Sequence, residues 1–187
     1  MSLLHRMALA DCPPRPWRNG GGVTRELLAW PRPEHWQLRI SVAAIEQDGP
    51  FSLFPGVQRW FAVLAGAGVR LDLARGAVTV EPHDSPIAFD GEDAPWCQLL
   101  EGSTLDLNFM AQRGAGVASL RAAAPGSSVD GDRRFRALYA ADAAQLDVDE
   151  RTEPIGAGTL VWSDDRDSSL WTLRHGRHAF WLTLEDA

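Results

Sequence analysis

The stretch Trp-Gln-Leu-Arg-Ile-Ser-Val at residues 36–42 sets apolar and polar side chains in strict alternation. The apolar residues hold the even positions, and Gln37, Arg39 and Ser41 hold the odd positions. A period of two over seven residues predicts a β-strand with one apolar face, because successive side chains on a strand point to opposite sides. The polar face would meet solvent or line a cavity, and we favour the cavity.

Further strand candidates lie on both sides of this stretch, and nearly all are separated by Gly or Pro, as at Gly49-Pro50 and Gly102. Short strands at regular spacing are typical of a β-sandwich or barrel. The only candidate helix covers residues 137–144, so we predict a mainly β protein. The other predicted strands cover residues 23–30, 58–64, 69–73, 78–80, 87–89, 96–100, 104–110, 134–139, 145–148, 159–162, 170–174 and 179–184.

A segment rich in Gly, Ala and Ser, at residues 114–132, forms a weak break that divides the predicted strands into two groups. Each group contains a Gly-Ala-Gly before an apolar strand, at residues 66–68 and 156–158. The repeat indicates two similar β-modules. A length of 187 residues with 45% hydrophobic content suits one compact domain or two small modules that share a core.

Composition excludes several function classes. All 18 basic residues are arginine, which rules out Schiff-base catalysis, pyridoxal phosphate attachment and a phosphate-loop lysine. The net charge of −7 argues against nucleic acid as a partner, because such binding depends on neutralising phosphates. Cys12 and Cys97 form no CxxC motif. The first ten residues lack the long apolar core of a secretory signal. The longest mostly apolar stretch has ten residues, which is too short to span a membrane. We expect a cytoplasmic protein with reduced thiols and no membrane partner.

The stretch Pro-Trp-Arg-Asn-Gly-Gly-Gly-Val-Thr-Arg-Glu at residues 16–26 supports two interpretations. Asn-Gly before a strand favours a simple hairpin turn. Three glycines exceed what a two-residue turn needs, so the alternative is an anion-binding nest in which glycine N–H groups and Arg25 hold a carboxylate.

The only other asparagine, Asn108, shares one strand face with Asp106. That face is either solvated or hydrogen-bonded to a ligand or loop, and Arg25, Arg39 and Arg59 are the candidate partners if it points inward. One close histidine pair, His175 and His178, has no nearby carboxylate, and no nucleophile motif occurs. We therefore expect no metal, no cofactor and no catalytic residue.

Three blocks of this sequence resemble the HutD/Ves family. They are the glycine-rich stretch at residues 16–26, the region from Trp36 to Arg59 with Asp-Gly-Pro-Phe-Ser at 48–52, and Phe-Asp-Gly-Glu at 89–92 with Asp-Leu-Asn-Phe-Met at 106–110. Together they span about residues 14–113.

The resemblance implies a bicupin, in which two cupin-like antiparallel β-sandwich or barrel modules form one compact chain. Residues 1–187 would be a single domain, with modules at about 14–113 and 114–187 that share N-terminal strands. It also implies a link to histidine utilisation, and a regulatory, ligand-sensing role without an assigned enzymatic activity. Many cupins hold a metal through His-x-His and Glu, which this sequence lacks at the expected place.

Our leading hypothesis is a non-enzymatic binder of a small carboxylate from histidine catabolism, urocanate or formylglutamate, that modulates histidine utilisation. The alternatives are a cupin-type isomerase or hydrolase of a small organic acid, with a metal at His175 and His178, and a protein-interaction module with a vestigial pocket. The sequence leaves a homodimer open. The predicted ligand-binding residues are Trp17, Asn19, Gly20, Gly21, Gly22, Thr24, Arg25, Arg39, Ser41, Arg59, Asp106 and Asn108.

Overall fold

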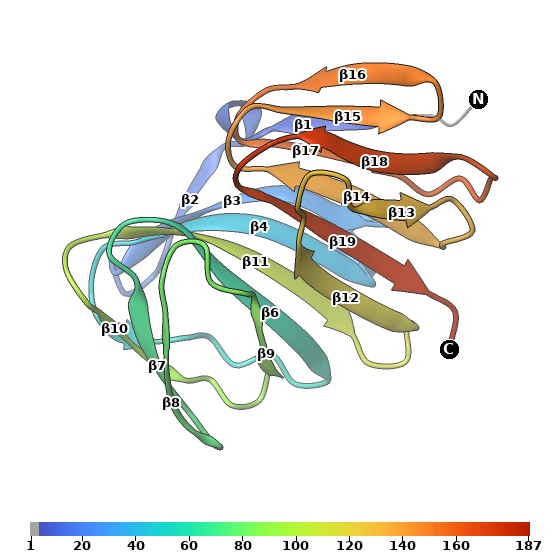
Figure 1. Cartoon of the computed structure of the whole chain (residues 1–187). Coiled ribbons are helices and arrows are strands. Elements are labelled where there is room, and N and C mark those ends of the chain that lie inside the picture. Colours follow the sequence, from blue (N-terminus) through green and yellow to red (C-terminus); the bar gives the residue numbers. More distant parts are fainter. Residues whose placement is uncertain (1–3) are drawn as a thin grey trace. The chain divides into compact units, whose positions relative to one another are not determined.

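The computed structural model describes residues 4–187 and consists almost wholly of antiparallel β-strands (Figure 1). These residues contain no α-helix, only the short 3₁₀ turns η1 (Leu9–Asp11) and η2 (Pro33–His35). In the described part of the chain no helix has the length and apolarity to cross a membrane. The chain forms two compact units. The first is Cys12–Arg113, and the second joins the residues up to Asp11 with Gly114–Ala187.

Two antiparallel sheets make up the first unit, and they enclose a core of aliphatic and aromatic side chains that includes Phe61, Val63 and Leu71. The six-stranded sheet has the order β2 (Pro14–Pro16), β3 (Gly22–Trp30), β4 (Leu38–Ile45), β11 (Thr104–Gln112), β6 (Val57–Ala65) and β9 (Ile87–Asp90). The four-stranded sheet has the order β5 (Gly49–Pro50), β10 (Trp96–Leu99), β7 (Val69–Leu73) and β8 (Gly76–Val80).

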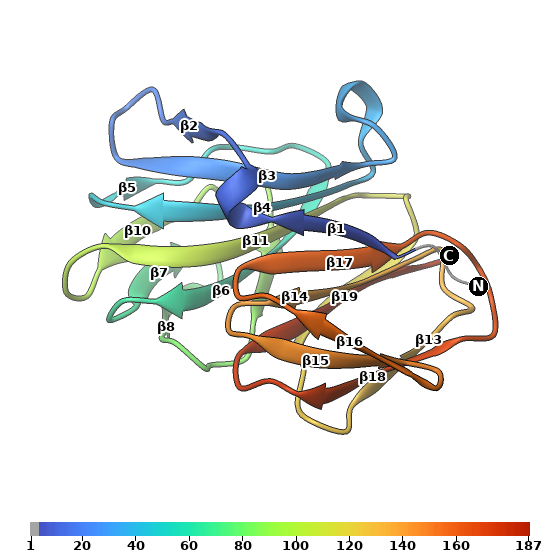
Figure 2. The same cartoon turned by 90° about the horizontal axis from the view of Figure 1, so that it is seen from above.

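The second unit repeats this plan of two antiparallel sheets, which Figure 2 shows from above. Its core includes Leu138 from one sheet and Trp171 from the other. The five-stranded sheet has the order β1 (His5–Ala8), β17 (Thr159–Ser163), β14 (Phe135–Ala140), β19 (Ala179–Glu185) and β12 (Val117–Ala122). The four-stranded sheet has the order β13 (Ser128–Asp130), β18 (Leu170–His175), β15 (Ala144–Val148) and β16 (Arg151–Ile155).

The strand predicted at residues 36–42 is confirmed as β4, and its apolar side chains Leu38, Ile40 and Val42 are buried. The helix predicted at residues 137–144 is wrong. Its first half belongs to β14, where the small side chains of Ala137 and Ala140 are fully buried in the sheet. Its Ala content suits either a helix or a tightly packed strand, and tertiary packing decides for the strand.

Candidate functional site

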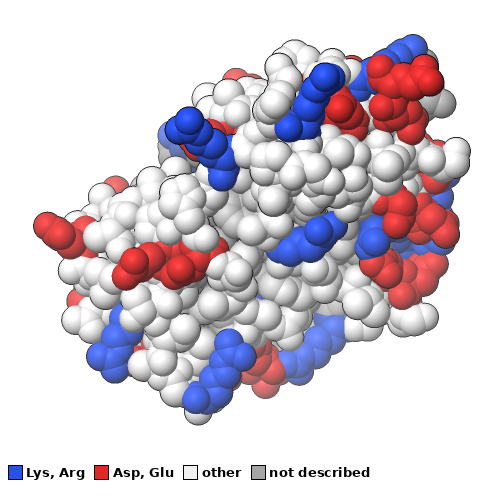
Figure 3. All heavy atoms as spheres, viewed as in Figure 1, with Lys and Arg blue, Asp and Glu red and all other residues white. Residues whose placement is uncertain are grey.

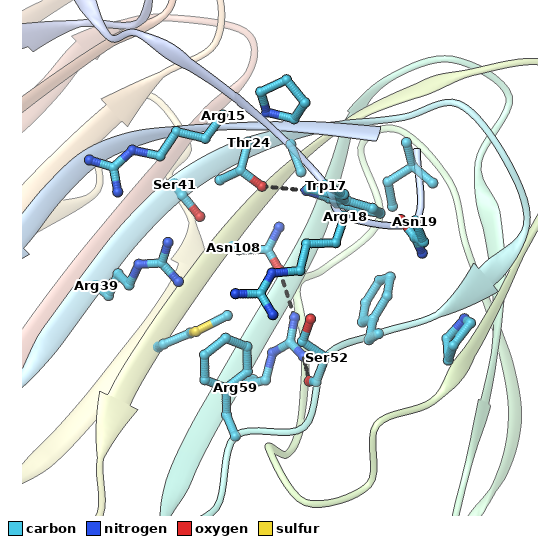
Figure 4. Close-up of a pocket in the computed structure, with 17 residues that line it drawn as sticks. Arg15, Trp17, Arg18, Asn19, Thr24, Arg39, Ser41, Ser52, Arg59 and Asn108 are labelled. Atoms are coloured by element: carbon cyan, nitrogen blue, oxygen red, sulfur yellow. Dashed lines mark hydrogen bonds between the residues drawn. The ribbon is translucent and has the colours of Figure 1, made fainter. Parts of the chain in front are cut away.

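The first unit contains a cavity of about 570 Å³, shown in Figure 4. Its walls come from the β2–β3 hairpin, the face of β4 and β11, the start of β6 and the segment that follows β5. The lining residues are Arg15, Pro16, Trp17, Arg18, Asn19, Thr24, Arg39, Ser41, Ala43, Ile45, Pro50, Phe51, Ser52, Phe54, Arg59, Asn108 and Met110.

The alternation that predicts β4 also builds one wall of the cavity. Arg39 and Ser41 occupy odd positions and project into the cavity, while the even positions pack on the other face of the sheet. In the register of β4 with β11, Ser41 lies opposite Asn108 and Arg39 lies opposite Met110. All four of these side chains therefore line the same wall.

A tight hairpin supplies the adjoining wall, because β3 pairs with β4 in the same sheet. The N–H of Trp17 donates to the carbonyl of Gly22 at 2.9 Å, and the indole Nε1 donates to Thr24 Oγ1 at 2.7 Å (Figure 4). Gly22 is required by space, because a Cβ there would lie 2.3 Å from the carbonyl oxygen of Ala44 and 3.2 Å from the Trp17 ring. This glycine therefore lets the hairpin close onto β4 with the indole at the cavity.

The backbone N–H groups of the glycine run are used inside the turn. Gly20 N–H donates to the carbonyl of Trp17 at 3.0 Å, and Gly21 N–H donates to Asn19 Oδ1 at 3.0 Å. Gly20, with φ of 72°, adopts a left-handed conformation that suits glycine. None of Gly20, Gly21 and Gly22 lines the cavity, so the hairpin-turn interpretation describes this segment and the anion-nest interpretation does not.

Arg59 is the most deeply placed cation of the cavity, with only 4% of its surface exposed. Its guanidinium donates to Asn108 Oδ1 at 3.1 Å and to the carbonyl of Ser52 at 3.3 Å (Figure 4). The Nε atom has no hydrogen-bond partner among the described residues. Burial and the positive charge of Arg39 lower the pKa of Arg59 to about 10, so the group remains a cation at neutral pH.

Three phenylalanine rings surround this guanidinium. Its Cζ lies 5.0 Å from the ring centroids of Phe51 and Phe89 and 5.5 Å from that of Phe54. The rings hold the cation through cation–π contacts and exclude water from its sides. The acceptors it does have are a neutral amide and a carbonyl, so its charge lacks a carboxylate partner within the described chain.

The cavity lining carries four arginines and no acidic residue. One of the four, Arg39, is neutralised from outside the lining, because its Nε donates to Glu26 Oε2 at 2.6 Å. Arg15 and Arg18 are exposed on the hairpin. The face of the protein in Figure 3 shows a different pattern, in which arginines and acidic residues are interspersed. The cavity is therefore a local concentration of positive charge in a chain with a net charge of −7.

Seven of the residues predicted from the sequence line this cavity. They are Trp17, Asn19, Thr24, Arg39, Ser41, Arg59 and Asn108. Arg25 does not, because it follows Thr24 on β3 and lies opposite Val42, on the other face of the sheet, where its guanidinium donates to the carbonyl of Cys12.

Asp106 also lies away from the lining, although it shares a strand face with Asn108. It is fully buried and accepts a hydrogen bond from Thr104 Oγ1 at 2.7 Å, and burial raises its pKa to about 7. Burial, Asp106 and Asp48 together raise the pKa of the Cys97 thiol to about 12. A buried thiol with so high a pKa is a packing residue and not a nucleophile.

The prediction from the sequence omitted the aromatic wall formed by Phe51 and Phe54, and the exposed arginines Arg15 and Arg18. Ala43 and Met110 could have been found, because they continue the period-two faces that hold Ser41 and Asn108. No periodic signal marks Phe51 or Phe54, which lie in the irregular segment after β5.

A divalent metal does not fit this cavity. Its lining contains no His, Cys, Asp or Glu, and its four arginines would repel a cation. Within residues 4–187, no group of three such metal-ligating side chains lies together. His175 is exposed at the end of β18, and the ring of the buried His178 lies 5.2 Å from that of Phe180 at an interplanar angle of 51°.

Two units, each built of two antiparallel sheets, define the protein as a bicupin. An oxalate decarboxylase of Bacillus subtilis shares the fold over the whole of this chain and 78% of its own, with a TM-score of 0.65 and 12% identity. HutD from Pseudomonas fluorescens SBW25, solved in a formate condition, superimposes with a TM-score of 0.87 over 99% of this chain and all of its own, at 24% identity.

The HutD family model matches residues 9–181, and the chain belongs to this family. Protein Ves of Citrobacter koseri is 39% identical over 111 residues, which cover 57% of each chain. An uncharacterized 21.2 kDa protein of Pseudomonas putida, encoded in the hutC 3′ region, is 40% identical over 114 residues, which cover 59% of each chain. The matches thus span less than two thirds of these relatives, and the family is associated with histidine-utilisation genes.

Proposed function

We propose that the cavity of the first unit binds a small carboxylate of histidine catabolism, urocanate or formylglutamate, and that the protein senses this ligand without transforming it. The observation that carries the proposal is Arg59, a buried cation at the base of an open cavity whose acceptors among residues 4–187 are all uncharged. A ligand carboxylate would supply the negative charge that this arginine lacks.

The remaining lining suits a small planar or flexible acid. Ser41 and Asn108 offer a hydroxyl and an amide beside Arg59, while Trp17 and Phe51 offer apolar surface. Pockets for small ligands combine such an apolar lining with a few polar groups that fix orientation. The choice of a histidine-derived acid rests on the family's association with histidine-utilisation genes.

Titration calorimetry with urocanate and with formylglutamate tests the proposal. We expect Arg59→Met to weaken binding by about 1.5–3 kcal/mol, the loss of a hydrogen bond to a charged group, which is about 10- to 150-fold. Arg70→Ala is the matched control, because Arg70 lies on β7 of the same unit, is half exposed and is not in the cavity lining. Equal affinities of Arg59→Met and the wild type for both acids would exclude Arg59 as the anchor.

A further inference from the structure

The second unit also contains a buried arginine, Arg136, which is the second residue of β14 and is fully buried. It lies on the same strand face as Leu138 and Ala140, both members of the core of this unit. Its Cζ lies 4.9 Å from the Trp171 ring on the facing sheet. An aromatic ring and a sheet face thus hold the guanidinium at one end of the core.

Donors converge on one oxygen beside this arginine. Asp167 Oδ1 accepts from Arg136 Nη2 at 2.9 Å, from the backbone N–H of Ser169 at 2.9 Å and from Ser169 Oγ at 2.6 Å. Arg136 Nη2 also donates to Ser169 Oγ at 2.8 Å. A guanidinium, a backbone N–H and a hydroxyl around one oxygen are the chemistry that recognises a carboxylate.

The backbone on the other side makes room for this carboxylate. A Cβ on Gly131 would lie 2.2 Å from Arg136 Nη1 and 2.3 Å from Asp167 Oδ1. The N–H of Asp167 donates to the carbonyl of Gly131 at 3.1 Å, which fixes the segment that carries the acid. The Asp167 side chain is 27% exposed, whereas that of Arg136 is wholly buried, so the carboxylate lies between the guanidinium and solvent.

We propose that Arg136, Ser169 and Gly131 form a second carboxylate-binding site, which the chain's own Asp167 fills, and that a small free carboxylate occupies it once the Asp167 side chain is removed. The site lies entirely in the second unit, so it is independent of the function proposed for the first cavity. Because Asp167 is the group nearest solvent, its truncation opens the route to the guanidinium.

Thermal unfolding of Asp167→Ala in sodium formate, compared with sodium chloride of equal ionic strength, tests this site. We expect the variant to melt below the wild type in chloride, and formate to raise its Tm saturably by at least about 2 °C more than it raises that of the wild type. Asp186→Ala is the matched control, because Asp186 also pairs with an arginine, Arg166, but at an exposed position. The same formate shift in the wild type and Asp167→Ala would overturn the proposal.

Formate could also bind in the first cavity. To distinguish that binding from binding at the second site, the formate shifts in Tm with and without Asp167→Ala are compared again in a protein that carries Arg59→Met. The extra shift caused by Asp167→Ala should persist there, and its loss would overturn the second site. If Asp167→Ala does not fold in chloride, the proposal requires formate to restore its near-ultraviolet circular dichroism. Failure to fold in either salt would equally count against it.

Discussion

Arg59 and Arg136 occupy similar positions in the two units but have different electrostatic environments. Each is at the start of a strand, on the face that continues into the core, and each contacts aromatic rings. Arg136 has a carboxylate partner in Asp167, while the acceptors of Arg59 in the described part of the chain are the amide of Asn108 and the carbonyl of Ser52. The buried arginine is therefore neutralised by a carboxylate of its own unit in the second unit, and it has uncharged acceptors in the first unit.

Together with the proposed function, this difference suggests a division of stability and binding between the two units. Moving a charge out of water is costly unless a counter-charge and hydrogen bonds compensate it. Compensation from within the chain, as at Arg136, fixes a loop to the core. Compensation left to an external anion, as we propose for Arg59, would provide a binding site at some expense of stability in the free protein.

Asp167→Asn should produce the largest change, because it removes the carboxylate while keeping the shape of the side chain. It removes the carboxylate that pairs with the buried Arg136, and breaking a buried ion pair in this way costs about 3–5 kcal/mol. Urea unfolding measures this loss. Asp186→Asn, at an exposed pair, should cost much less, and equal losses at the two sites would remove the distinction between buried and exposed pairs.

Asp106→Asn tests the buried acid of the first unit, which forms no salt bridge with Arg59 within the described chain. Its folded pKa, raised to about 7, exceeds the unfolded value near 3.8, so the folded state binds the extra proton between these pH values. The wild type should therefore lose about 4 kcal/mol of stability at this site as pH rises from 4 to above 7, and the loss is absent below pH 4.

Unfolding free energies of the wild type and Asp106→Asn at pH 5 and pH 8 check this prediction. The difference between the two proteins should shift in favour of the Asn variant at pH 8. Asp72→Asn, at an exposed position on β7, should keep the wild-type pH dependence. Parallel pH profiles for the wild type and Asp106→Asn would show that the buried carboxyl does not titrate in this range.

Asn108→Asp would replace the neutral amide beside Arg59 with a carboxylate, so that Arg59 gains a charged partner like that of Arg136. The new carboxylate lies within 3.1 Å of the guanidinium in the position of Oδ1, so it should neutralise Arg59 and repel a ligand anion. We expect calorimetric affinity for the small acids to fall by about 1.5–3 kcal/mol, while the unfolding free energy does not fall. Unchanged affinity would mean that the ligand is held elsewhere in the cavity.

Gly131→Ala should give the smallest effect of the series. The added Cβ would press on the Arg136–Asp167 pair, and such overpacking costs about 1–3 kcal/mol. Gly156→Ala is the control in the same unit, because the nearest atom to its Cβ would be 3.4 Å away. If the two variants unfold alike in urea, Gly131 is not needed to accommodate the ion pair.

Much of the fold follows from local patterns in the sequence. The Gly and Pro residues between apolar stretches predict where strands end. The alternation in β4 predicts the strand itself and the polar wall with Arg39 and Ser41. Strands β12 and β13 fall in the Gly-, Ala- and Ser-rich segment that we expected to be a break, because their pairing partners β19 and β18 supply the order that local composition does not.

The site was only partly predictable for reasons of strand geometry and tertiary structure. Alternation alone forbids Thr24 and Arg25 from facing the same cavity, so choosing both from the glycine-rich motif could not succeed. The proximity of Arg59 to Phe51 depends on the path of an irregular segment, and that of Arg136 to Asp167 joins residues 31 positions apart. Neither has a periodic signature.

The placement of β1 has a consequence for biosynthesis. This strand, at His5–Ala8, pairs with β17 at Thr159–Ser163, so the second unit takes its first strand from one end of the chain and the rest from the other. During translation the residues of the first unit emerge as one continuous stretch and can fold while the ribosome is still working. Strand β1 has to wait unpaired until β17 has been made, so the second unit is completed only after the residues of the first unit have all emerged.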